Sequence, residues 1–190
     1  MNKKLILIGL GNPLEEYKNT PHNAGRNFID WLANSWQAEK WQKDKKTLTQ
    51  ICFFKKEGFE GILAKPLVFM NDSGKSAKLL KQFYKIPVSH FLVFHDDGDI
   101  NLGKFKISYN RGSAGHKGVE SIIKNFNSKK FFRCRIGIRP PDSKKQKTEK
   151  FVLKNLKPEE KTTLYQSFPA IEEELKQTLK IISQELKNQD

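Results

Sequence analysis

Two short stretches of uninterrupted apolar residues constrain the fold of this chain more than any other feature. They run from Leu5 to Leu10 and from Phe91 to Phe94, and turn-forming or polar residues follow each of them. Such runs are typical of strands that are buried on both faces, as happens where helices cover both sides of a sheet. The pattern therefore predicts an α/β fold, a twisted sheet flanked by helices on both faces.

Hydrophobic periodicity and turn residues place the remaining elements. The 190 residues fit one domain spanning 1–190, because domains usually contain about 100–200 residues. Further strands are expected at Leu48–Phe54, Gly61–Lys65, Lys104–Ser108 and Arg133–Ile138, and helices at Thr20–Trp36, Asp72–Tyr84, Val119–Phe126 and about 158–188. Residues 139–150 are polar and basic, and we expect them to form a mobile lid.

Positive charge is concentrated in one quarter of the chain. Residues 101–150 contain 14 Lys and Arg against 3 Asp and Glu, whereas residues 151–190 contain 6 against 7. A local excess of this size indicates a face that binds a polyanion such as RNA. The alternative is an ordinary solvated surface of a lysine-rich protein, and the charge count alone leaves it open.

Cysteine usage and hydropathy limit the surroundings in which the chain works. Its two cysteines, Cys52 and Cys134, lie far apart in the sequence. Two unpaired thiols are typical of a reducing compartment, so we expect a cytoplasmic protein. The sequence contains no run of about 18 apolar residues that would span a membrane, and the first apolar run is too short for the core of a signal peptide.

Four polar clusters follow expected strands or begin expected helices, which is where the sites of α/β proteins gather. They are Gly11-Asn12-Pro13, His22-Asn23, Asn71-Asp72-Ser73-Gly74 and His95-Asp96. The first cluster does not match the dinucleotide-binding fingerprint, because Leu14 stands where the third glycine is required. A nicotinamide or flavin cofactor is therefore not expected.

His22 is the candidate general base. We expect it in the first turn of a helix, where the helix dipole disfavours the imidazolium and keeps the ring able to accept a proton. Asp96 is a candidate to orient the second ring nitrogen, so that the pair would activate a water molecule. Two alternatives remain open: His22 is an ordinary capping or surface residue, or His95 binds a metal ion with Asp96, Asp97 and Asp99.

Taken in order, the polar clusters resemble those of bacterial-type peptidyl-tRNA hydrolases. The matching stretches are Gly9-Leu-Gly-Asn-Pro13, Glu16-Tyr17, Thr20-x-His-Asn-Ala-Gly25, Lys65-Pro66, Phe69-Met-Asn-x-Ser-Gly74, His95-Asp96 with Asp99, Gly112-Ser-Ala-Gly-His116 and Arg135-Ile-Gly-Ile138. Each motif alone is weak, but the ordered set spans residues 5 to about 153 and is specific. The resemblance implies a mixed sheet wrapped by helices. It also implies an enzyme, usually monomeric and without metal or cofactor, that cleaves the ester between a peptide and the 3′ ribose of tRNA.

The resemblance further implies a role for each site residue. His22 would be the general base and Asp96 its partner. Contacts to the 3′ end of the tRNA and to the peptide would come from Asn12, Tyr17, Phe69, Met70, Asn71, His116 and Lys117. Phosphates of the acceptor stem would be held by basic side chains of residues 101–150, namely Lys104, Lys106, Arg111, Arg133 and Arg135.

The chain departs from the family's pattern at two positions. The family's Thr-Arg-His-Asn run is Thr20-Pro21-His22-Asn23 here, and its Gly-His-Asn-Gly run is Gly115-His116-Lys117-Gly118. Lys117 keeps a donor and adds a charge but loses the acceptor of asparagine, so we expect an active enzyme with altered activity. Two alternatives are a non-catalytic RNA-binding relative, as plant organellar splicing factors are, and a hydrolase of another ester.

Overall fold

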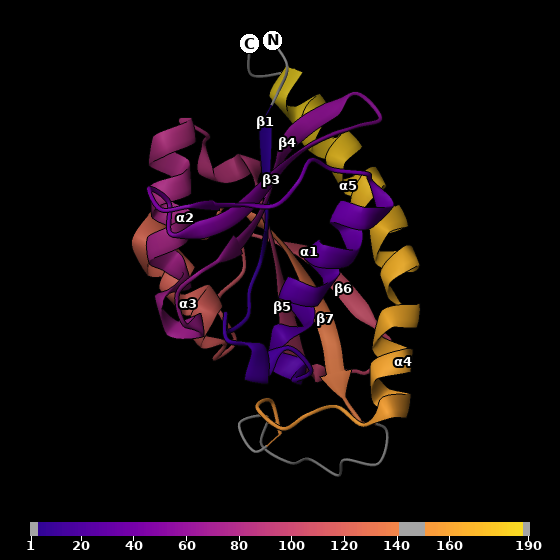
Figure 1. Cartoon of the computed structure of the whole chain (residues 1–190). Helices are drawn as coiled ribbons and strands as arrows, with labels where there is room; N and C mark the ends of the chain where they lie inside the picture. Colours follow the sequence, from indigo (N-terminus) through magenta and orange to yellow (C-terminus); the bar gives the residue numbers. More distant parts are fainter. Residues whose placement is uncertain (1–3, 141–150, 188–190) are drawn as a thin grey trace.

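A mixed seven-stranded sheet lies at the centre of the molecule, with helices on both of its faces (Figure 1). The computed structural model describes residues 4–140 and 151–187. In chain order, the strands are β1 Lys4–Gly9, β2 Gln42–Asp44, β3 Thr49–Lys56, β4 Phe59–Pro66, β5 Phe91–Asn101, β6 Phe105–Tyr109 and β7 Phe132–Arg139. The α-helices are α1 Ala24–Ser35, α2 Ser73–Tyr84, α3 Lys117–Phe126, α4 Pro158–Gln166 and α5 Phe168–Lys187. Four short 3₁₀ turns join them: η1 Glu15–Tyr17, η2 Pro21–Asn23, η3 Met70–Asp72 and η4 Val88–His90.

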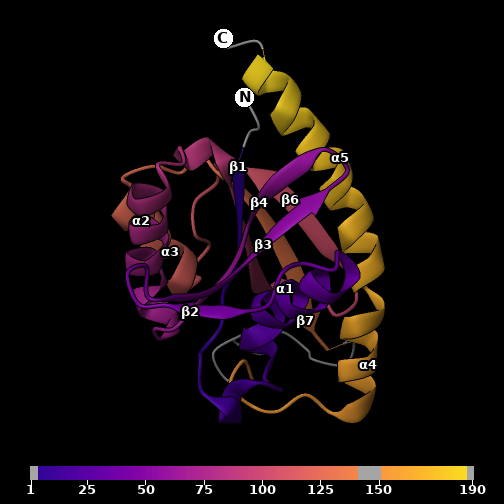
Figure 2. The same cartoon turned by 45° about the horizontal axis from the view of Figure 1, so that its top comes forward.

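The strand order is β2-β3-β4-β1-β5-β7-β6. The four consecutive strands β4, β1, β5 and β7 are parallel, whereas β2, β3 and β6 pair antiparallel to their neighbours. Helices α2 and α3 cover one face of the sheet, and α1 and α5 cover the other, as both Figure 1 and Figure 2 show. The predicted α/β fold with helices on both faces is confirmed.

Most of the apolar run from Leu5 to Leu10 forms the central strand β1, whose two faces are both buried. Its side chains alternate between the two cores, with Leu5 and Leu7 on the α1–α5 side and Ile6 and Ile8 on the α2–α3 side. All four are at most 2% exposed. A strand that contributes to both cores has no position for a polar side chain until it reaches the edge of the sheet.

Two glycines bring α1 against the carboxyl ends of the strands. A Cβ on Gly25 would lie 2.1 Å from the carbonyl oxygen of Phe94, and a Cβ on Gly9 would lie 2.4 Å from the carbonyl oxygen of Gly25. Only glycine permits an approach this close. The start of α1, and the turn with His22 that precedes it, therefore lie directly against β5 at Phe94.

Several boundaries differ from the sequence prediction. Strand β5 continues beyond Phe94 to Asn101, because Asp96 and Asp97 pair with β7. The three-residue strand β2 was not predicted, since its side chains are mostly exposed. The α-helix expected from Pro21 begins at Ala24, so that His22 lies in the 3₁₀ turn η2. The predicted lid at 139–150 lies, apart from its first two residues, outside the described residues.

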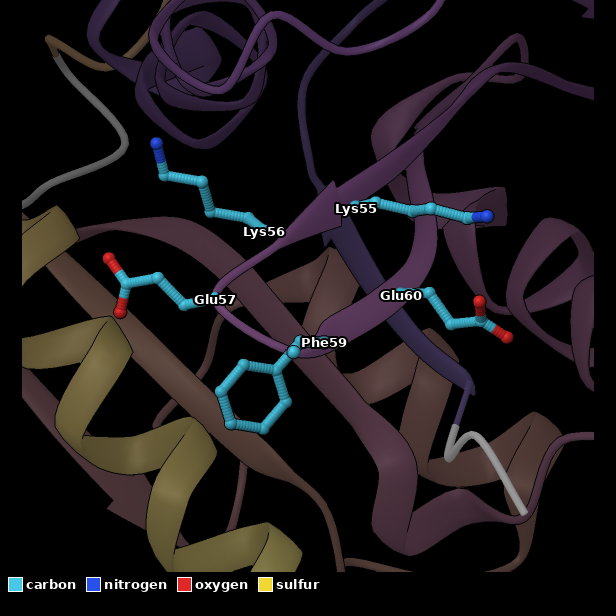
Figure 3. A pocket seen from close by; sticks show the side chains of 6 residues that line it. Lys55, Lys56, Glu57, Phe59 and Glu60 are labelled. Carbon is cyan, nitrogen blue, oxygen red and sulfur yellow. The ribbon is translucent and has the colours of Figure 1, made fainter.

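The hairpin between β3 and β4 forms a shallow pocket far from the polar clusters (Figure 3). Lys55 to Glu60 line it, and Glu57 approaches Lys176 of α5 at 3.5 Å. Because Glu60 pairs with the start of β1, the pocket lies at the opposite end of the sheet from Gly9. Within the described residues, no helix is both long enough and apolar enough to cross a membrane.

Candidate active site

The carboxyl ends of β1, β5 and β7 meet the starts of α1 and α3 at one end of the sheet, the end to which the arrowhead of β7 points in Figure 1. The turn η2 brings His22 to this end from the α1 side. The residue before α3 brings His116 from the opposite side of the sheet. Asp96, near the middle of β5, lies between them. This is the place where α/β folds commonly bind their ligands.

One carboxylate oxygen joins the two histidines. Oδ1 of Asp96 lies 2.8 Å from Nδ1 of His22 and 2.8 Å from Nε2 of His116. Asp96 is 2% exposed. Burial raises the pKa of Asp96, but the two imidazole groups and their hydrogen bonds lower it much more, so that the net pKa is far below its usual range. The carboxylate is therefore an ionised acceptor for two ring N–H groups.

The second ring nitrogen fixes the tautomer of His116. Its Nδ1 accepts a hydrogen bond of 3.2 Å from the backbone N–H of Val119, in the manner of a helix N-cap. A nitrogen that accepts this bond carries no proton, so the proton of a neutral ring must be on Nε2. His116 consequently donates to Asp96 and has no lone pair left to act as a base.

His22 has the opposite arrangement. Its Nδ1–H donates to Asp96, which leaves the lone pair of Nε2 to accept a proton. Burial lowers the pKa of His22, the charge and hydrogen bond of Asp96 raise it, and the charge of Lys117 lowers it; the net pKa is raised. His22 was expected in the first turn of an α-helix, but it lies in the 3₁₀ turn η2 directly before α1, where Asp96 raises its pKa.

A second network fixes the loop after β1. The backbone N–H of Asn12 donates to the side chain of Asn23 at 2.8 Å, and the Asn23 amide donates back to the Asn12 carbonyl at 3.0 Å. The side-chain oxygen of Asn12 accepts a bond of 2.9 Å from the backbone N–H of Met70. With its oxygen engaged, the Asn12 side chain has its NH₂ group to offer a substrate.

The other predicted substrate contacts differ in how far they are exposed. Met70 is buried, and its sulfur lies 2.4 Å from the position of a Cβ on Gly118. Phe69 is 48% exposed, Asn71 and Lys117 are also exposed, and Tyr17 is half-buried on η1. The charge of Lys117 reaches His22, as the pKa of that ring indicates.

The predicted phosphate-binding residues fall into two groups. Lys104, Lys106 and Arg111 are exposed. Arg135 donates through Nε to the Asp97 carboxylate at 2.7 Å and remains partly exposed. Arg133 is only 3% exposed, and its Nη2 donates to the Gly112 carbonyl at 2.8 Å. The Arg133 guanidinium is therefore directed into the protein rather than toward the surface.

The donor set does not favour a metal ion. The acids of the alternative site have arginine partners, Asp97 with Arg135 and Asp99 with Arg139, and His95 uses Nδ1 for the Asp96 carbonyl. Ligand atoms of His22, Asp96 and His116 lie within 4.8 Å of one another. An ion bound there would need the Nε2 lone pair of His116, which is available only if the bond from Val119 is broken.

Sequence reasoning missed two structural roles. Asn23 holds the backbone of Asn12, and His116, for which a contact with substrate is predicted, also contacts Asp96. The spacing His116-x-x-Val119 is that of an N-cap and its N3 residue, and it would have predicted the start of α3 at Lys117. The contact between His116 and Asp96 joins residues 20 positions apart. No local pattern encodes such a contact.

Comparison with known proteins finds relatives along nearly the whole chain. A family model described as Peptidyl-tRNA hydrolase matches residues 6–189. The peptidyl-tRNA hydrolase of Mycoplasma capricolum is 36% identical over 163 residues, covering 86% of each chain. That of Aquifex aeolicus is 39% identical over 166 residues, 87% of this chain and 84% of the relative. A crystal structure of peptidyl-tRNA hydrolase from Acinetobacter baumannii has a TM-score of 0.80 at 31% identity, covering 89% of this chain and 85% of that one.

Proposed function

The chain belongs to the peptidyl-tRNA hydrolase family, and from that premise we propose how its residues hydrolyse the ester between the peptide and the 3′ ribose of peptidyl-tRNA. The observation that carries the mechanism is the bond between His22 Nδ1 and Asp96 Oδ1. It makes Nε2 of His22 the proton acceptor. His22 is therefore the general base, and Asp96 fixes its tautomer and stabilises the imidazolium that forms.

The reaction uses one water molecule and returns the proton it borrows. Nε2 of His22 takes a proton from water while the water oxygen bonds to the ester carbonyl carbon. The resulting tetrahedral species expels the 3′ oxygen of the ribose, which takes the proton from the imidazolium. The products are the free peptide acid and tRNA with a 3′ hydroxyl. General base catalysis of this kind contributes about 10²- to 10⁴-fold to the rate.

The NH₂ group of Asn12 is suited to the developing oxyanion. Its oxygen is held by Met70 N–H and its backbone by Asn23, so the donor is oriented before the substrate binds. Preoriented donors stabilise charge that appears in the transition state. The exposed donors of Asn71 and Lys117 would contact the 3′ nucleotide or the peptide.

The exposed cations Lys104, Lys106 and Arg111 would hold phosphates of the acceptor stem. Phosphate contacts provide affinity without sequence preference, which suits an enzyme that acts on many tRNAs. The substrate and the two buried thiols are consistent with the cytoplasm.

A single-turnover assay on labelled peptidyl-tRNA tests the base assignment. We expect His22→Ala to lower the rate at least about 10²-fold while tRNA binding persists. His90→Ala is the control, because His90 lies at the other end of β5 and contacts the Lys4 carbonyl. Equal turnover of His22→Ala and wild type would refute the assignment. Tight tRNA binding without turnover of the wild type would favour the non-catalytic alternative.

A further inference from the structure

Arg133 occupies an unusual position for a residue expected to bind RNA. It lies on β7, one strand in from the edge strand β6, and pairs with Val93 on one side and Ser108 on the other. Its side chain is almost completely buried, and burial lowers the pKa of its guanidinium. Placing a charge there is costly unless its donors are well used. Its Nη2 donates to the Gly112 carbonyl, and the charge of the Asp97 carboxylate partly offsets the lowering of its pKa.

Gly112 belongs to the loop 110–116, which connects β6 to α3. Three of its residues, Asn110, Ala114 and Gly115, have positive φ angles of 53°, 50° and 81°. Residues with side chains rarely adopt this conformation, so the loop needs contacts that hold it. Backbone hydrogen bonds hold both ends of the loop, from Asn110 N–H to the Phe131 carbonyl and from His116 N–H to the Ser113 carbonyl. The Arg133 side chain donates a hydrogen bond to its middle, at the Gly112 carbonyl.

The loop ends at His116, which donates the second hydrogen bond to Asp96. The ring of His116 also packs edge-on against His95, with 4.6 Å between the ring centroids. His95 is itself held by its bond to the Asp96 carbonyl. A change in the loop of even a fraction of an ångström would therefore reach the carboxylate that orients the base.

We propose that Arg133 is a positioning residue, which holds loop 110–116 so that His116 can fix the Asp96 carboxylate toward His22. The inference rests on the proposed function of His22 and Asp96. It replaces the expectation that Arg133 contacts tRNA phosphate. That contact requires a cationic group at the surface. Lys106 on the edge strand β6 is exposed and can provide one, whereas Arg133 is only 3% exposed.

Two substitutions separate the hydrogen bond from the charge. Arg133→Lys keeps the charge but loses the planar fork that reaches Gly112, and Arg133→Met also removes the charge while keeping most of the volume. Lys106→Gln is the comparison variant for a phosphate contact. For each variant, three quantities are measured: the single-turnover rate against pH, the salt dependence of tRNA affinity, and the ¹⁵N NMR signals of the His116 ring.

We expect both Arg133 variants to lower the single-turnover rate by up to about 100-fold, because small misplacements of catalytic groups have effects of this size. The salt dependence of their tRNA affinity should equal that of wild type. Lys106→Gln should lower the slope of log affinity against log salt by about 0.7 to 0.9. The His116 signals should change from a single Nε2–H tautomer to a mixture in both Arg133 variants.

A reduced salt slope in Arg133→Met, with the rate of wild type, would overturn the proposal in favour of a phosphate contact. A wild-type rate and a single His116 tautomer in Arg133→Lys would show that the bond to Gly112 is not needed. If circular dichroism shows that Arg133→Met does not fold, Arg133→Lys decides alone. If the wild type itself lacks turnover, the proposed function fails, and the His116 signals still decide whether Arg133 positions the ring.

Discussion

Replacing Asp96 by asparagine should change both the height and the position of the pH–rate profile. The side chain keeps its shape, and its oxygen can still accept from both histidines at the 2.8 Å separations of the wild type. What disappears is the negative charge. In the wild type that charge raises the pKa of His22 above 6.5, against the lowering by burial and by Lys117. In the variant the charge no longer raises the pKa of His22, whereas burial and Lys117 still lower it, so this pKa falls.

The plateau rate should fall because the imidazolium formed during proton transfer loses its buried counter-ion. Removing one partner of a buried ion pair costs about 3–5 kcal/mol. At about 1.4 kcal/mol for each factor of ten, this corresponds to a rate lower by about 10²- to 10⁴-fold. The rate depends on unprotonated His22, so it rises with pH through the pKa of that ring. The acid limb of the Asp96→Asn profile should therefore lie at lower pH than that of wild type.

Single-turnover hydrolysis of peptidyl-tRNA, followed by rapid quench from about pH 5 to about pH 9, measures both effects. Asp99→Asn is the matched control, since Asp99 is 73% exposed, pairs with Arg139 and lies outside the proposed site. An Asp96→Asn plateau equal to that of wild type would refute the role of the carboxylate. A limb that moved to higher pH would refute the electrostatic reasoning even if the plateau fell.

Three further predictions concern packing, the lysine departure and stability. Gly25→Ala places a Cβ 2.1 Å from the carbonyl oxygen of Phe94, so the free energy of unfolding measured in urea should fall by about 1–3 kcal/mol. Gly112→Ala is the control: its Cβ meets nothing within 4 Å, so it should unfold like wild type. Lys117→Asn removes a charge that lowers the pKa of His22, so the acid limb of its profile should move to higher pH, and Lys117→Arg should leave the limb in place. The pKa of Asp96 in the folded protein is far below the ordinary 3.8. Its ionised form therefore stabilises the fold fully above about pH 4, and this stabilisation is lost as the pH falls toward the pKa of the folded state. The stability gap between wild type and Asp96→Asn in urea unfolding should widen as the pH falls through the range in which His22 titrates, and narrow below about pH 4.

The sequence was sufficient for the fold because burial on two faces leaves a strong pattern. Strand β1 could be predicted from its apolar run alone, whereas β2, with three mostly exposed residues, carries no such pattern. The end of β5 was missed for a related reason: Asp96 and Asp97 are polar, but they pair with β7 and continue the strand. Polar residues inside a strand contradict the local pattern, and such contradictions are expected at functional sites.

The site was only partly predictable, because the chemistry depends on both nitrogens of each ring. His22 and His116 lie equally close to Asp96, and distance alone gives no reason to choose between them. The choice comes from the other nitrogen: in His116 it accepts from Val119, and in His22 it keeps its lone pair. The helix cap at His116 therefore favours His22 as the base in the proposed mechanism. This explains why His116 must be placed accurately, and why a buried arginine behind its loop has consequences for catalysis.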